Sequence, residues 1–172
     1  MRALPAILAA RPNARVIVVG GDEVSYGRAL PAGQNYRQKY LAELGPTADW
    51  SRVHFVGKLP YAGYLKVLQV SKAHVYLTYP FVLSWSMLEA MSAGAPLVAS
   101  ATAPVTEVIQ HEHNGLLFDF FDTHALTRAV CRMLDDEVLR KNISTTARDT
   151  IIQRYDLRVV CLPALLGLVQ RY

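Results

Sequence analysis

Residues 79–100 read YPFVLSWSMLEAMSAGAPLVAS, and this stretch decides the fold class. The run 73–79, which leads into this stretch, predicts a strand, because it is short, largely apolar and followed by a proline. A helix is expected over 84–93, ended by Gly94, and another strand over 95–100. A strand, a helix and a strand in close succession are typical of a parallel sheet with crossover helices.

The same alternation continues on both sides of this stretch. The expected strands are residues 14–21, 53–57 and 115–118, and the expected helices are residues 36–44, 61–70 and nearly the whole chain from 123, with breaks near 134–136 and 155–156. Residues 14–21 are rich in valine and isoleucine and stopped by two glycines, which predicts a strand buried on both faces. We therefore expect an α/β fold, in which helices flank a parallel sheet on both faces. The chain opens on a helical pattern with no strand before it, so the first strand of the sheet is expected to be missing.

In sheets of this kind the ligand binds outside the carboxyl ends of the strands. The helix expected after Pro80 begins at that edge, and its free N–H groups and positive dipole end favour a phosphate. Glu89 lies on this helix, where a carboxylate could accept two hydrogen bonds from a ribose diol. Ser86 and Glu89 also have the spacing of a capping box, in which Glu89 would only bind the first helical N–H. The residues alone leave both roles open.

Composition excludes several classes of protein. The 172 residues are 52% hydrophobic and 19% charged, which is typical of one globular domain. The net charge of +4 is scattered, without the basic stripe of a nucleic-acid-binding protein. No apolar run approaches the length of about 20 residues that spans a bilayer, and Cys131 and Cys161 are expected as buried free thiols in a reducing compartment. We therefore expect a cytoplasmic protein without a transmembrane segment or a nucleic-acid partner, and docking to the inner face of the membrane stays open.

Neither a metal nor a cofactor is expected. No GxGxxG opens a helix after a strand, and no Walker-type phosphate loop is present. Asp22 and Glu23 follow a strand and could bind a metal, but this is not the favoured interpretation. The run 111–113, His-Glu-His, lacks a third ligand nearby and precedes the turn signal Asn114-Gly115, so it is expected as an exposed turn. We expect Tyr61, Tyr64 and Tyr76 in the core or at its rim.

Residues 88–91 and 93–100 resemble the signature of the group 1 glycosyltransferases, also called family 4. The likeness continues through 11–21, 53–57, 107–109 and 114–118, so it covers nearly the whole chain in order. It implies one half of a GT-B architecture, with residues 1–172 as the Rossmann-like C-terminal domain, truncated at its N-terminal edge, that binds a nucleotide-diphosphate sugar. The acceptor-binding N-terminal domain is the implied partner and is expected to be absent here. The implied reaction is retaining transfer of a glycosyl group to an unknown acceptor, a glycan or a lipid, as in polysaccharide biosynthesis, and the fragment alone is expected to be inactive.

The resemblance also assigns roles to residues of the helix start. In the family, two glutamates separated by seven residues flank the phosphate-binding turn, and Glu89 matches the second, which holds the ribose. The first falls at Phe81, whose ring cannot accept hydrogen bonds from a sugar. Phe81 would line an apolar wall of the sugar site or pack in the core. Val82, Leu83 and Ser84 match the segment whose backbone N–H groups approach the diphosphate.

Two further family features are less complete in this sequence. Gly57, Lys58 and Leu59 match the loop whose backbone meets the nucleobase. The arginine and lysine that neutralise the diphosphate would lie before Met1, so the catalytic residues are unknown. Lys58 is the nearest basic substitute, unless it is a solvated turn lysine. The departure at Phe81 favours the alternative function, a non-catalytic GT-B-like module for nucleotide binding or scaffolding.

Overall fold

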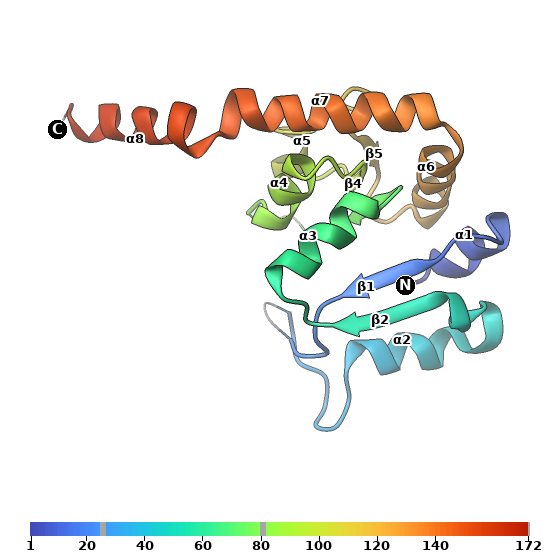
Figure 1. The fold of residues 1–172 in the computed structure, drawn as a ribbon. Coiled ribbons are helices and arrows are strands. Elements are labelled where there is room, and N and C mark those ends of the chain that lie inside the picture. The colour runs from blue at the N-terminus through green and yellow to red at the C-terminus, as the bar shows by residue number, and fades with distance from the viewer. Residues whose placement is uncertain (25–26, 80–81, 172) are drawn as a thin grey trace. The chain divides into compact units, whose positions relative to one another are not determined.

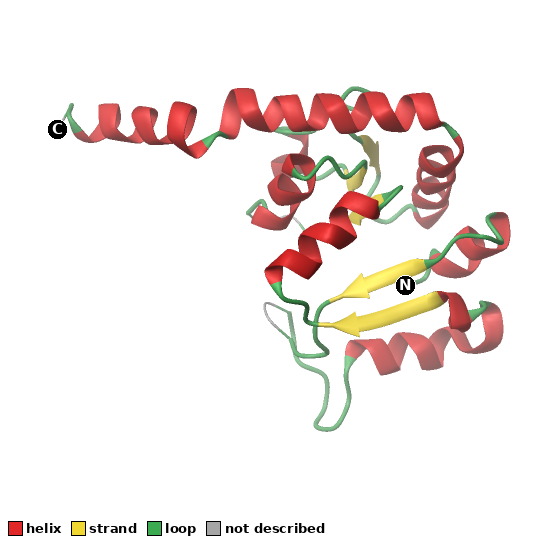
Figure 2. Ribbon diagram, in the orientation of Figure 1, coloured by secondary structure: helices red, strands yellow, loops and turns green. Residues whose placement is uncertain are grey.

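The computed structural model describes residues 1–24, 27–79 and 82–171. These residues form two compact units, Met1–Tyr64 and Leu65–Tyr172. Helix α3 (Tyr61–Val70) begins in the first unit and ends in the second. Both units combine parallel strands with helices, as Figures 1 and 2 show.

The first unit holds a two-stranded parallel sheet. Its elements are α1 (Leu4–Ala10), β1 (Val16–Val19), α2 (Tyr36–Leu44), the short turns η1 (Gly45–Thr47) and η2 (Trp50–Arg52), and β2 (Val53–Gly57). Val16 pairs with Val53 and Val18 with Phe55. Helix α2 starts where the Asn35 side chain accepts the Gln38 N–H at 2.8 Å, a regular N-cap.

The prediction that the first strand is buried on both faces is wrong. No residue of β1 is buried, and the side chain of Ile17 is 45% exposed. A parallel strand loses both faces to the core only when helices cover both sides of its sheet. The exposure of Ile17 means that one face of β1 lacks such a cover.

The second unit holds a three-stranded parallel sheet in the order β3-β4-β5. Its elements are β3 (His74–Tyr76), α4 (Trp85–Ser92), β4 (Leu97–Ser100), α5 (Ala103–Thr106), β5 (Leu116–Phe118), α6 (Thr123–Asp135), α7 (Glu137–Tyr155), the π-helical η3 (Leu157–Cys161) and α8 (Leu162–Val169). His74 pairs with Leu97, and Val98 with Leu116. The expected α/β class, with parallel strands and flanking helices, is confirmed.

Strand β4 and its neighbouring helices form the core of the second unit. All four residues of β4 are fully buried. The helical residues that pack in this core recur at intervals of three and four, as on the inner face of an amphipathic helix. They are Met87, Ala90 and Met91 of α4, Leu126, Val130 and Met133 of α6, and Ile143 and Ala147 of α7.

The C-terminal helices end where the sequence predicts. Asp136 separates α6 from α7, and its carboxylate accepts the Leu139 N–H at 2.8 Å as the N-cap of α7. Helix α7 ends at Tyr155, and Asp156 caps the π-helical segment that follows. Figure 1 shows α8 continuing beyond α7, away from the sheet of its unit. Leu165, Leu166 and Leu168 of α8 are each more than half exposed.

Two composition-based expectations can be compared with the structure. Cys131 and Cys161 are free thiols, but each is half-buried rather than buried. Within residues 1–24, 27–79 and 82–171, no helix combines the length and the apolar character needed to cross a membrane.

Candidate functional site

The chain leaves β3 earlier than expected and turns toward α4. The strand predicted over 73–79 ends at Tyr76. Beyond it, the Thr78 N–H donates to the Ser100 hydroxyl at 3.3 Å, and that hydroxyl donates to the Thr78 carbonyl at 3.4 Å. Ser100 is fully buried at the carboxyl end of β4. The Ser100 side chain thus binds Thr78 just beyond the last backbone pair of β3 and β4, Tyr76 with Ala99.

Helix α4 begins with Ser84 as its N-cap. Ser84 is extended, and its hydroxyl accepts the Ser86 N–H at 3.3 Å. The Ser84 N–H itself donates to the Tyr76 hydroxyl at 3.0 Å. The predicted capping box of Ser86 and Glu89 is wrong, because the N-cap is Ser84 and not Ser86. Glu89 is the fifth residue of α4 and lies beyond the first helical turn.

The Glu89 side chain is half-buried on α4. Among the residues that the structure describes, none forms a hydrogen bond or an ion pair with its carboxylate. The backbone N–H groups of Val82 and Leu83 likewise have no acceptor in the described part of the chain. The two residues before the N-cap of α4 therefore carry unengaged amides, and the helix itself carries an unengaged carboxylate. Phe81 lies outside the described residues.

The same edge of the sheet holds an unmatched polar group. In the described ranges, the Thr102 hydroxyl is the buried side-chain oxygen without a hydrogen-bond partner. Thr102 follows β4 directly, two residues after Ser100. Polar groups gather at the carboxyl ends of β3 and β4, where an α/β sheet binds its ligand.

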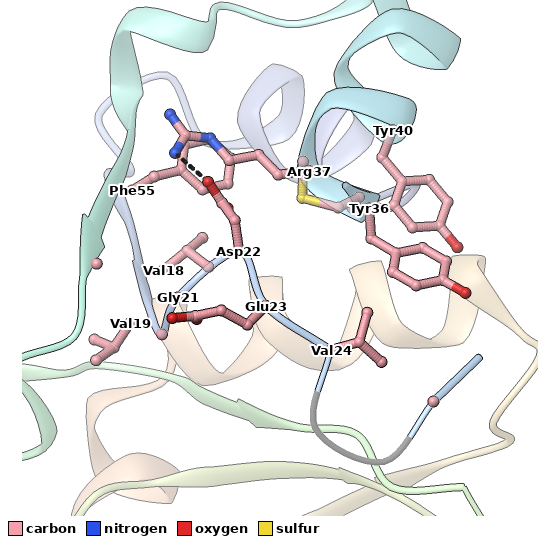
Figure 3. Close-up of a pocket in the computed structure, with 14 residues that line it drawn as sticks. Val18, Val19, Gly21, Asp22, Glu23, Val24, Tyr36, Arg37, Tyr40 and Phe55 are labelled. Carbon is pink, nitrogen blue, oxygen red and sulfur yellow. Dashed lines mark hydrogen bonds and ion pairs between the residues drawn. The ribbon is translucent and has the colours of Figure 1, made fainter. Parts of the chain in front are cut away.

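The first unit has a cavity of about 480 Å³ at the carboxyl ends of its own strands. Tyr36 and Tyr40 of α2 line it together with Phe55 of β2 (Figure 3). The Arg37 guanidinium lies 4.4 Å from the centre of the Phe55 ring and 3.4 Å from the Asp22 carboxylate. The cavity is thus mainly apolar and aromatic, with one ion pair at its wall.

The profile of the glycosyl transferases group 1 family matches residues 1–150. The chain belongs to this family. Among curated relatives of this group 1 chain is the N-acetyl-alpha-D-glucosaminyl L-malate synthase of Bacillus anthracis, 30% identical over 104 residues, 60% of this chain and 27% of that protein. The chain spans between 27% and 36% of the length of the first three curated relatives.

Solved structures support the fold of the group 1 chain. Anabaena HepE in complex with UDP-glucose superposes with a TM-score of 0.80 at 21% identity, over 99% of this chain and 45% of that one. WaaG, a glycosyltransferase involved in lipopolysaccharide biosynthesis, gives 0.71 at 20% identity, over 95% and 41%. These neighbours are GT-B glycosyltransferases, and this chain corresponds to the C-terminal half of that fold.

The basic candidate of this group 1 chain, Lys58, is engaged in the first unit. Its ammonium lies 2.7 Å from the Glu23 carboxylate, and both side chains are mostly exposed. The hydrogen bond from Lys58 holds the pKa of the Glu23 carboxyl below its usual value. Gly57, which precedes Lys58, lines the cavity of the first unit. The structure thus favours the turn-lysine interpretation of Lys58.

The other polar candidates have structural partners. Asp22 pairs with Arg37, and within the described ranges no three metal-ligating side chains gather in one place. The His111 Nδ1 accepts the Leu117 N–H at 2.9 Å, and the Glu112 carboxylate pairs with Arg132. Glu112 has a positive φ of 64°, which marks a tight turn.

Three residues hold the turns of this family member, and the sequence alone assigns none of them a role in the site. Tyr76 is buried, as expected, but its hydroxyl bond to Ser84 was not foreseen. Ser100 stood inside the family signature without a role. Asn114, read only as a turn signal, is buried and donates to the Val108 carbonyl at 3.0 Å and to the Thr150 hydroxyl at 3.1 Å. Tyr61, which the sequence predicts in the core or at its rim, is instead 61% exposed. For Ser100, the sequence does contain a signal of a specific role, because it is a polar residue at the end of an otherwise apolar strand.

Proposed function

We propose that this chain is the donor-binding domain of a retaining glycosyltransferase, which binds a nucleotide-diphosphate sugar for transfer to an acceptor. The observation that carries the proposal is that the Val82 and Leu83 amides before α4, and the Glu89 carboxylate within it, are unengaged in the described part of the chain. Membership of the group 1 family supports the glycosyltransferase part of the proposal.

The diphosphate is the charged part of this donor and the leaving group of the reaction. Amides at a helix start, with the positive end of the helix dipole behind them, stabilise such an anion. Donors fixed before the reaction stabilise the charge that develops as the glycosidic bond breaks. We assign the diphosphate to the turn of Val82, Leu83 and Ser84. Of the three amides, that of Ser84 already donates to Tyr76, so those of Val82 and Leu83 are the available donors.

We assign the ribose of the nucleotide to Glu89. A carboxylate accepts hydrogen bonds from both hydroxyls of a diol, and charged hydrogen bonds are stronger than neutral ones. The half-buried position of Glu89 supports this role, because partial removal from water strengthens such bonds. No described residue competes for the carboxylate.

The first unit, taken by itself, has a candidate for contact with a nucleobase in the turn of Gly57, Lys58 and Leu59, the loop that the family resemblance indicates. Gly57 lines the cavity of about 480 Å³, whose walls include Tyr36 and Phe55. Aromatic walls suit a flat base, which gains stacking energy against such rings. The solved complexes of Anabaena HepE with UDP and UDP-glucose make uridine donors the first to test.

The complete enzyme needs more than these residues. The curated relatives are about three times as long as the matched region, which supports an N-terminal domain that supplies the acceptor site. A non-catalytic module is the second candidate, and the phenylalanine at position 81 is the observation that favours it. Transfer of the glycosyl group from a bound nucleotide sugar to an acceptor hydroxyl or to water, with release of the nucleoside diphosphate, separates the two.

The test is a calorimetric titration of the full-length protein with UDP and UDP-glucose, and with the corresponding guanosine and adenosine compounds. We expect one nucleotide series to bind saturably, and Glu89→Gln to weaken it by about 1–3 kcal/mol, the cost of lost charged hydrogen bonds. Asp149→Asn is the matched control, because Asp149 is an exposed carboxylate on α7 in the same unit. Unchanged affinity in Glu89→Gln contradicts the ribose assignment, and no saturable binding by any series contradicts the donor-binding function.

A further inference from the structure

Two buried hydroxyls bind backbone groups of described residues between β3 and α4, one at Thr78 and one at Ser84. Ser100 binds both the N–H and the carbonyl of Thr78, at 3.3 and 3.4 Å. The Tyr76 hydroxyl accepts the Ser84 N–H at 3.0 Å. Ser100 is fully buried and Tyr76 is 6% exposed, so water hardly competes for either bond.

The Tyr76 bond has a specific effect on the backbone of the turn. Ser84 is the N-cap of α4, and its N–H is one that the helix itself cannot satisfy. Tyr76 accepts this N–H from within the core, so the peptide plane before Ser84 faces inward. The amides of Val82 and Leu83 remain without an acceptor in the described part of the chain. The turn is thus divided into one amide that anchors it and two that are available to a ligand.

We propose that Tyr76, together with Ser100, is a positioning residue for the diphosphate: its hydroxyl fixes the Ser84 amide and thereby directs the Val82 and Leu83 amides at the ligand. The inference rests on the function proposed above. Neither hydroxyl touches the donor; each acts through the backbone. A binding site whose donors are held in place by a supporting layer of hydrogen bonds loses less freedom when the anion binds.

A positioning role differs from a purely structural one in what it changes. If Tyr76 only packs in the core, removing its hydroxyl alters stability and leaves relative affinities alone. If it directs the turn, the loss falls on ligands that carry the β-phosphate. The ratio of the affinities for a nucleoside diphosphate and for the matching monophosphate separates the two roles.

The experiment compares Tyr76→Phe with the wild type in the full-length protein, by titration with UDP and UMP, or with the guanosine or adenosine pair if that series binds. Phenylalanine keeps the ring that fills the core. We expect roughly tenfold weaker binding of the diphosphate, the size of one net hydrogen bond, and less than about twofold change for the monophosphate. Tyr155→Phe, which removes a hydroxyl at the end of α7, is expected to change neither.

A second variant covers the case in which Tyr76→Phe fails to fold. Ser100→Ala removes the other anchor with little change of volume and is expected to give the same selective loss. Equal weakening of both ligands, or of neither, by a folded variant overturns the positioning role. If the wild type binds no nucleoside diphosphate at all, it is the donor-binding function that fails. Wild-type binding with unchanged ratios leaves that function standing and rejects only this inference.

Discussion

Strands β1 and β4 are both short and mostly apolar, and their surroundings differ. β1 reads VIVV and β4 reads LVAS, and both are short apolar runs. Every residue of β4 is fully buried, whereas Ile17 of β1 is 45% exposed and none of its neighbours in the strand is buried. β4 lies between β3 and β5, while β1 pairs with β2 in a two-stranded sheet. Apolar residues predict the strand; the elements around it decide how much of the strand leaves water.

The ends of the strands differ in the same sense. In the first unit, the turns are held by exposed ion pairs, Lys58 with Glu23 and Arg37 with Asp22. In the second, buried hydroxyls of Tyr76 and Ser100 hold the turn. Exposed ion pairs contribute little and weaken with salt, whereas buried hydrogen bonds keep their strength. The contacts of the turn before α4 should therefore depend less on salt than the two ion pairs of the first unit.

The largest effect expected from this contrast is the difference in stability lost when an apolar side chain is removed from β4 or from β1. Leu97→Ala removes a fully buried side chain and should lower the free energy of unfolding by about 2–5 kcal/mol. Ile17→Ala removes a half-exposed side chain and should cost about 1 kcal/mol or less. Urea denaturation of both variants measures the two losses, and equal values would show that the contrast in burial has no energetic counterpart.

The next effect concerns buried polar contacts. Asn114 is 2% exposed, and its side chain also accepts the Gln110 N–H at 2.7 Å. Asn114→Ala should lower the free energy of unfolding by about 1–3 kcal/mol, because buried groups lose their partners. Asn142→Ala, at an exposed position of α7, is the matched control and should be nearly neutral. The same denaturation curves test both, and comparable losses would contradict the structural role of Asn114.

The smallest effect is a pH dependence from His74 of β3. Burial lowers the pKa of the His74 imidazole below its usual value of about 6.5. The unfolded chain thus binds this proton more readily, so the contribution of His74 to stability is lost as pH falls below 6.5 toward the lowered pKa. Thermal midpoints measured between pH 7.5 and 5 should fall less steeply in His74→Gln than in the wild type. If the thermal midpoints of the wild type and of His74→Gln fall equally steeply with pH, His74 does not contribute to the pH dependence of stability.

The sequence predicts the helices best where strong signals end them. The helix expected over 36–44 is α2, which Gly45-Pro46 stops, and the one expected over 61–70 is α3. Such signals act through the local backbone, so they are visible in a single sequence.

The site was harder to predict in detail, because its geometry depends on contacts between distant residues. The family signature located the α4 turn and Glu89, but the N-cap proved to be Ser84 rather than Ser86. The contact of Thr78 just beyond β3 involves Ser100, which is 22 residues away from it. Pattern alone cannot give the partner of a side chain that reaches across the sheet. The roles of Val82, Leu83, Phe81 and Glu89 stay predictions.

Helix α8 reads LPALLGLV and carries no charge, and its leucines and Val169 are exposed to water. Exposed apolar side chains of this number raise the free energy of the chain in water until another surface covers them. By mass action, any molecule that binds this face stabilises the folded state. A molecule that binds this face would therefore raise the melting temperature above the value measured without it, by an amount that grows with the concentration of that molecule.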